Sequence, residues 1–201
     1  MEKKSAIETL VATVLDGTEL RLKVDSYTLD EDFESVKAKV RCAVHNERTG
    51  KQETIQGVGV GLIDAFFHGL VEKYVSEFAS LDTIRFAHFA VNARLDSGKA
   101  KARSDSPAEV LLTVANSEGK EFLFTHNSPS ITRSSVDVVL QAVEFFINSE
   151  RAFIHVYRAL EHARKHNRPD SVKGYTAQLT TLVEATSYST VIAQIKKAEW
   201  G

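Results

Sequence analysis

The sequence predicts an α+β fold made of two successive units, each with three antiparallel strands followed by a helix. Apolar residues alternate with polar ones through most of residues 19–60 and again through 84–126, as in strands with one buried face. A run with the 3.6-residue period of a helix follows each set. Strands grouped before a helix indicate α+β architecture rather than parallel winding, with the sheets packed on the helices.

The first unit is expected to span residues 19–80, after an N-terminal helix over residues 1–18. Its strands are expected at 19–29, 34–46 and 51–60. In the second strand the side chains that should face the core are Val36, Ala38, Val40, Cys42 and Val44. The helix is expected from Leu62, where the apolar period changes from two to about 3.6.

The second unit is expected to span residues 84–150 and to repeat this order. Its strands are expected at 84–94, 108–116 and 120–126. A serine N-cap close to Pro129 marks the start of its helix. The two units together form the expected domain over residues 19–150. Residues 151–201 are expected to form a helical extension, interrupted at Arg168-Pro169-Asp170.

The composition excludes several classes of protein. Of 201 residues, 43% are hydrophobic and 26% are charged, which is enough apolar material to bury a core. The net charge of −2 creates no overall field that would attract nucleic acid or acidic lipid. The N-terminal segment lacks the unbroken apolar run of a signal peptide, and no segment reaches the length of a membrane span. We therefore expect a cytoplasmic protein without nucleic-acid or membrane partners.

Gly57, Gly59 and Gly61 stand at alternate positions before the first expected helix. A dinucleotide-binding loop would need a parallel unit and an acidic residue at the end of the next strand. The preceding strand is instead one arm of an expected hairpin, and the next strand ends in Val91-Asn92-Ala93-Arg94. The simplest structural alternative is a turn in which glycine permits a positive φ or close packing.

A third interpretation comes from the whole string GVGVGLIDA, residues 57–65. It resembles the turn that opens the first helix in the C-terminal regulatory domain of 2-isopropylmalate, citramalate and homocitrate synthases. That family's pattern is Gly-any-Gly-Asn-Gly-Pro-Ile-Asp-Ala, here with Val60 and Leu62 in place of Asn and Pro. Residues 128–143 resemble the turn and helix of the family's second unit, and FAHFAVNARLDSGKA resembles the strand between the units. The resemblance covers roughly residues 19–150.

The resemblance implies a homodimer of βββα units that binds leucine or isoleucine where the protomers meet. It places effector-binding positions at Gly59, Val60, Gly61, Ile63 and Asp64 in the first turn. It places others on the following strand and at the second turn, namely Phe86, Phe89, Ala93, Ala100, Asn127 and Pro129. Val60 lacks the amide of the usual Asn, and Phe89 lacks the hydroxyl of a Tyr often found there. The implied effector is a branched-chain amino acid or a similar metabolite.

The resemblance also implies a module without catalytic residues, cofactor or metal. The synthases carry catalysis on a TIM barrel, which needs about 250 residues. Their metal-binding His-any-His pair is absent from this sequence. We therefore expect a regulatory and dimerisation module, with a synthase catalytic subunit as its possible partner in trans. The alternative is a ligand-free scaffold that kept the fold and lost the effector pocket.

Other patterns have simpler interpretations than a functional site. His162 and His166 could bind zinc at their i, i+4 spacing, but Arg164 and Lys165 would oppose a cation. The basic run at 99–103 could contact phosphates, but it lacks interleaved aromatic residues and acids follow it. Ser134 and Ser135 lack a glycine elbow, and Cys42 is expected to be a small buried residue. None of these patterns displaces the regulatory module as the prediction.

Overall fold

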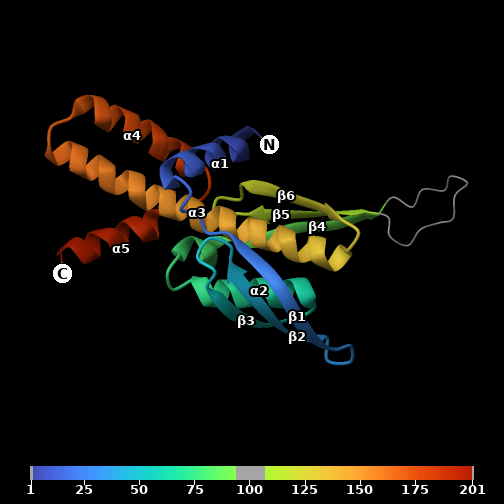
Figure 1. The fold of residues 1–201 in the computed structure, drawn as a ribbon. Helices are drawn as coiled ribbons and strands as arrows, with labels where there is room; N and C mark the ends of the chain where they lie inside the picture. Colours follow the sequence, from blue (N-terminus) through green and yellow to red (C-terminus); the bar gives the residue numbers. More distant parts are fainter. Residues whose placement is uncertain (1, 94–106, 201) are drawn as a thin grey trace, which may run out of the picture.

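The computed structural model describes residues 2–93 and 107–200 (Figure 1). Its elements in chain order are α1 (Glu2–Leu15), β1 (Leu22–Asp32), β2 (Lys37–Asn46), β3 (Gln52–Gly59), α2 (Leu62–Tyr74), the 3-10 helix η1 (Ala79–Thr83), β4 (Arg85–Ala93), β5 (Ala108–Ala115), β6 (Glu121–Ser128), α3 (Ile131–Lys165), α4 (Pro169–Leu182) and α5 (Ser189–Trp200). The strands form two antiparallel sheets, ordered β1-β2-β3 and β4-β5-β6. The expected α+β fold with two βββα units is confirmed.

Each sheet packs one face on the helix of its own unit. Helix α2 lies on β3 and β2 of the first sheet, and α3 lies on β5 and β6 of the second. The two helices also contact each other, which joins the units through one core. Residues 134–150 of α3 are buried almost without interruption, because α1, α2 and β1 also pack against this helix. We call the helix-covered side of each sheet its inner face.

The predicted alternation in β2 is confirmed for most of the strand. Ala38, Val40, Cys42 and Val44 are buried on the inner face. The prediction was wrong for Val36, which is 60% exposed. This residue lies in the turn between β1 and β2 with φ +51°, so its side chain never reaches the inner face.

The first strand of each unit carries a β-bulge at the corresponding place. The register of β1 against β2 shifts between Val24 and Ser26, and that of β4 against β5 shifts between Phe86 and His88. A bulge inserts one extra residue, so the alternation reverses beyond it. It therefore lets Phe86 and Phe89, three residues apart, lie on the same face of β4. The shared bulge supports the interpretation of the two units as repeats.

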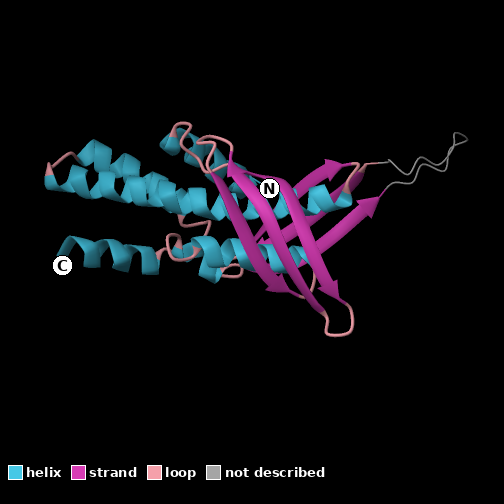
Figure 2. Cartoon of the chain, turned by 60° about the horizontal axis from the view of Figure 1, so that its bottom comes forward, coloured by secondary structure: helices cyan, strands magenta, loops and turns pink. Residues whose placement is uncertain are grey.

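The C-terminal part of the chain forms a helical arm that extends away from the sheets (Figure 2). Helix α3 is 35 residues long and continues past the sheets to Lys165, where α4 turns back along it. The predicted break is confirmed, since α4 begins at Pro169. The expected boundary between residues 150 and 151 falls inside α3, and the division into separate domains stays a prediction.

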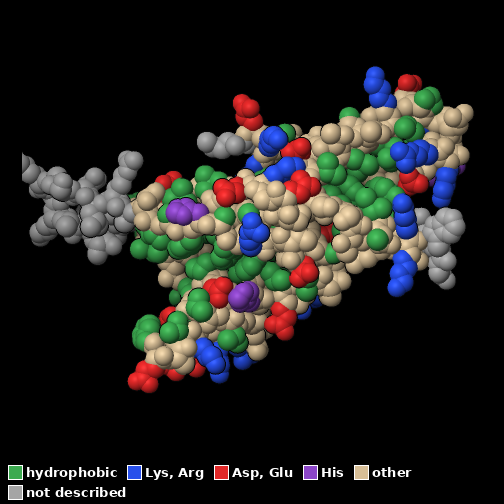
Figure 3. Space-filling model, turned by 180° about the vertical axis from the view of Figure 1, so that it is seen from behind, with side chains coloured by type: hydrophobic (Ala, Val, Ile, Leu, Met, Phe, Trp, Pro, Cys, Tyr) green, Lys and Arg blue, Asp and Glu red, His purple; other side chains and the backbone are tan. Residues whose placement is uncertain are grey.

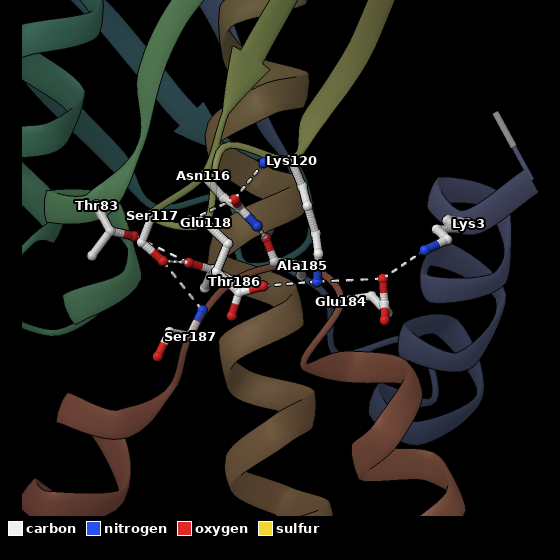
Figure 4. Close-up of polar contacts among 10 residues, drawn as sticks. All are labelled: Lys3, Thr83, Asn116, Ser117, Glu118, Lys120, Glu184, Ala185, Thr186 and Ser187. Carbon is white, nitrogen blue, oxygen red and sulfur yellow. Dashed lines mark hydrogen bonds and ion pairs between the residues drawn. The ribbon is translucent and has the colours of Figure 1, made fainter.

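The segment between α4 and α5 is anchored on the turn between β5 and β6 (Figure 4). The buried Asn116 side chain donates its amide N–H to the Ala185 carbonyl over 2.7 Å. Its amide oxygen accepts the backbone N–H groups of Glu118 and Lys120, both at 2.9 Å. One side chain therefore shapes the turn and fixes the arm to the second sheet.

Candidate functional site

Close packing explains two of the three glycines before α2. A Cβ on Gly59 would lie 2.5 Å from the Ala65 backbone nitrogen, and a Cβ on Gly57 would lie 2.7 Å from the Gly69 nitrogen. Real Cβ atoms do not approach that closely, so β3 contacts α2 backbone to backbone only because glycine occupies these positions. Gly61 precedes α2 in an extended conformation, and a Cβ there would make only an ordinary contact, 3.9 Å from Oε1 of Glu31. None of the three has a positive φ.

Asp64 occupies the start of α2. Its Oδ2 atom accepts the Val60 backbone N–H over 3.0 Å, and its Oδ1 lies 3.6 Å from Nε2 of His68. A carboxylate in the first turn is favourable because the helix dipole is positive there. The Val60 side chain is 66% exposed. The start of α2 therefore presents a negative charge beside an uncovered apolar side chain.

The two phenylalanines of β4 have different environments. The Phe86 ring packs on Phe67 of α2, with 4.3 Å between ring centroids. Phe89 lies on the same face but is 40% exposed. Helix α2 and β4 run in opposite directions, so β4 ends toward the end of the molecule where α2 begins (Figure 1). Ala93 ends β4, and Ala100 lies outside the described residues.

The second turn begins α3 through a different cap. Ser130 is the N-cap, and its hydroxyl accepts the Arg133 N–H over 3.2 Å. Pro129 precedes it and is exposed. Asn127 pairs with Glu109 on the outer face of the second sheet, whereas Phe89 lies on the inner face. The structure therefore places Asn127 and Phe89 on opposite faces of the second sheet.

Helices α2 and α3 both begin at the end of the molecule opposite the helical arm (Figures 1 and 2). This arrangement brings Ile63 and Asp64 to the same end as Ser130 and Arg133. Asp64 supplies a negative charge at one helix start, and Arg133 supplies a positive charge at the other. Arg133 Nε also lies 3.6 Å from Oδ2 of Asp137, one turn further along α3.

Exposed apolar side chains lie on the inner faces of β1 and β4, and of these the expected site residues included only Phe89. We call this set the apolar strand surface, and its members are Tyr27, Leu29, Phe89 and Val91, each 37–42% exposed. Val60 and Ile131, at the starts of α2 and α3, are also exposed apolar side chains. Simple alternation from Leu22 would place Tyr27 and Leu29 on the outer face, and the bulge at Asp25 reverses this. Only the bulge position, which carries no clear sequence signal, would have revealed this surface.

The remaining candidate residues have structural roles. His162 and His166 are exposed with their rings stacked, and His166 Nδ1 lies 2.8 Å from the His162 carbonyl oxygen. Ser134 Oγ, in the first turn of α3, contacts Ser128 Oγ and His126 Nδ1 at the end of β6. Cys42 is fully buried, and burial raises the pKa of its thiol to about 11.

The described residues offer neither a metal-binding cluster nor a membrane-spanning helix. Within residues 2–93 and 107–200, no three His, Cys, Asp or Glu side chains come together in a way that could hold a metal ion. In the same part of the chain no helix, including the 35-residue α3, has an apolar stretch long enough to span a bilayer. The described residues build two open sheets rather than an eight-stranded barrel.

Comparison with known proteins gives one informative similarity. A probable 2-isopropylmalate synthase from Archaeoglobus fulgidus is 28% identical to the chain over 146 residues. These residues cover 73% of this chain and 26% of the synthase, so the chain spans about a quarter of that relative's length. No family model matches the chain. The similarity and the two βββα units are consistent with a related regulatory domain.

Proposed function

We propose that this chain is a regulatory module that dimerises and binds a branched-chain amino acid, leucine or isoleucine, or a similar metabolite at the interface. The observation that carries the proposal is the exposure of the apolar strand surface on two sheets whose helices, α2 and α3, both begin at the same end of the molecule. The partial similarity to a probable 2-isopropylmalate synthase supports the choice of effector class. The proposal implies a separate synthase catalytic subunit as the partner on which the module acts in trans. It also implies that both proteins are cytoplasmic.

The exposed apolar side chains support dimerisation through the first strand of each unit. Tyr27 and Leu29 of β1 correspond to Phe89 and Val91 of β4, since each pair follows a bulge. All four remain exposed on faces that are otherwise buried under helices. Figure 3 shows hydrophobic side chains gathered on the sheet end of the molecule. Exposed apolar side chains at several such positions are typical of protein interfaces.

The two helix starts supply the polar contacts that a zwitterion requires. Asp64 places a carboxylate at the start of α2, where the ligand's ammonium would lie. The first turn of α3 offers backbone N–H groups beside Arg133, which suit the ligand's carboxylate. The branched aliphatic tail would then contact Val60 and Phe89. Val60 and Phe89 fall within the set expected from sequence, whereas Arg133 is an addition from the geometry.

The dimer is tested by a pair of matched substitutions on opposite faces. Phe89→Glu places a charge on the apolar strand surface, and Leu123→Glu places one on the outer face of β6. The two side chains are 40% and 38% exposed, so neither change disturbs the core. We expect light scattering to give a dimer mass for the wild type and for Leu123→Glu, and a monomer mass for Phe89→Glu. A monomeric wild type, or a dimeric Phe89→Glu, would refute this interface.

Ligand binding is tested by thermal unfolding with leucine, isoleucine or valine. A ligand at 100 times its dissociation constant stabilises the folded state by about 2.7 kcal/mol. We expect Asp64→Asn and Arg133→Gln to reduce that stabilisation. Lys73→Gln, in the last turn of α2, removes a charge away from the helix starts and should leave it unchanged. Stabilisation that survives both Asp64→Asn and Arg133→Gln would show that the ligand binds elsewhere.

A ligand-free scaffold is the second candidate function. Two observations favour it: Asp64 already accepts the Val60 N–H, and Asn127 faces away from the helix starts. This candidate shares the dimer interface with the first and lacks the pocket. A stable dimer that none of the three amino acids stabilises would identify the scaffold.

A further inference from the structure

The helical arm has a charge opposite to that of the rest of the chain. Residues 151–201 contain eight Lys or Arg and four Asp or Glu, whereas residues 1–150 contain 17 and 23. Figure 3 shows Lys and Arg side chains gathered at the end of the arm. The overall charge of −2 hides this separation. The arm is therefore the part of the chain where an anion would be attracted.

A hollow of about 560 Å³ lies at the base of this arm, between α3 and the end of α1. Its lining residues are Leu15, Thr18, Arg151, Ile154, His155, Arg158 and Ala159. Arg151, His155 and Arg158 occupy positions i, i+4 and i+7 of α3, so they share one side of the helix. Leu15, Ile154 and Ala159 supply an apolar floor, and no carboxylate belongs to the lining.

The arginines of the hollow lack carboxylate partners. Among the described residues, every ion pair formed by an arginine involves Arg133 or Arg164. The only hydrogen bond that Arg151 donates there goes to the amide oxygen of Asn148, at 3.3 Å.

Arg151 lies among charges of both signs. Burial, followed by the nearby charge of Arg48, lowers the pKa of Arg151, and Glu77 and Glu19 oppose that change. Arg48 is itself held on the Gly17 carbonyl, at 3.2 Å. Among the described residues no carboxylate lies within ion-pair distance of Arg151, which leaves its guanidinium available to an anion.

We propose that this hollow binds a compact dianion, a phosphate ester or a dicarboxylate with a short apolar body. Arg151 and Arg158 would each donate charge-assisted hydrogen bonds to its oxygens, and Thr18 lies at the rim. The apolar floor suits the carbon skeleton of such a ligand. The site shares no residue with the proposed effector site, so each can fail independently of the other.

The experiment compares inorganic phosphate, succinate and chloride by thermal unfolding and calorimetry at one ionic strength. We expect phosphate or succinate to stabilise the folded chain and chloride to have no effect. Arg158→Gln and Arg151→Gln should each weaken that binding about tenfold, the loss of one charge-assisted contact. Arg158 is exposed, so its variant keeps the fold.

Arg164→Gln is the matched control on the same helix. Arg164 is paired with Glu161 at 2.9 Å and lies outside the hollow. Unchanged binding in this variant, together with losses in the other two, would establish the site. An equal loss in all three variants would reveal a general attraction to the basic arm and would overturn the proposal. Equal stabilisation by phosphate, succinate and chloride would also overturn it.

Discussion

Gly57 of β3 and Gly69 of α2 face each other where the strand crosses the helix. A Cβ on Gly69 would lie 2.5 Å from the Gln56 carbonyl oxygen, and one on Gly57 would lie 2.7 Å from the Gly69 nitrogen. The obstacles are backbone atoms, which cannot rotate away. We therefore expect Gly69→Ala to separate α2 from β3 and to lower the free energy of unfolding by about 1–3 kcal/mol. Urea denaturation measures this loss.

Gly174→Ala supplies the control for that substitution. Gly174 also lies inside a helix, α4, but a Cβ there would meet no atom within 4 Å. Alanine is the better helix former by about 1 kcal/mol, so this variant should be more stable than the wild type. Opposite signs for the two substitutions would show that packing, rather than helix propensity, requires glycine at position 69. Equal signs would contradict this explanation.

The sequence predicted the strands and helices well because alternation and helical period are local signals. The inner residues of β2 and the start of α4 at Pro169 follow directly from such patterns. The turn around Val36 was missed because a left-handed residue can interrupt alternation without any Gly or Pro. The length of α3 was missed because the chain from Ile131 to Lys165 contains no helix-ending signal at residue 150.

The candidate site was harder to predict than the fold. The register decides which face a side chain occupies, and one bulge reverses it. The sequence therefore gave no means to see that Asn127 faces outward while Phe89 faces inward. A resemblance in sequence assigns positions along the chain, whereas the surroundings of Asp64 and Arg133 depend on how α2 and α3 are arranged in space.

Asn116→Asp separates the two roles of the Asn116 side chain. The carboxylate keeps the acceptor for the Glu118 and Lys120 N–H groups, but it cannot donate to the Ala185 carbonyl 2.7 Å away. We expect the variant to lose about 1–3 kcal/mol of stability. Amide hydrogen exchange should accelerate in the segment between α4 and α5 and stay slow in the turn between β5 and β6. Fast exchange in both places would mean that the turn itself depends on the amide.

Cys42 reports directly on the core of the first unit. Its side chain is fully buried, and its thiol has a pKa of about 11, so little reactive thiolate exists near neutral pH. We expect a thiol reagent to modify it only as fast as the native protein unfolds. Thr28→Cys adds an exposed thiol on β1 and should contribute one immediate reaction per chain. Immediate modification of the wild type would show that the inner face of β2 opens readily.

Glu144 should make the stability of the chain depend on pH. Its carboxyl group lies in a hollow of about 230 Å³ between α1 and α3, where Oε1 accepts the Leu22 N–H at 2.5 Å. Burial raises the pKa of Glu144 from 4.5 to about 7, with a smaller contribution from Glu47 and opposition from the Leu22 hydrogen bond. The folded chain therefore holds a proton that the unfolded chain releases.

The sign of the pH effect follows from that difference. Between pH 4.5 and about 7 the folded state binds more protons than the unfolded state, so the free energy of unfolding falls as pH rises. Below this range the Glu144 carboxyl is protonated in both states, and above it the carboxyl is charged in both.

Glu144→Gln keeps an acceptor for the Leu22 N–H and removes the group that titrates. We expect the stability of this variant relative to the wild type to rise by about 3 kcal/mol from the acidic to the alkaline side of this range. Glu72→Gln, at an exposed position on α2, is the control. Its free energy of unfolding, measured by urea denaturation, should change with pH in the same way as that of the wild type. If the stability of Glu144→Gln also changed with pH as the wild type does, the Glu144 carboxyl group of the wild type would be ionised in the folded chain across this range.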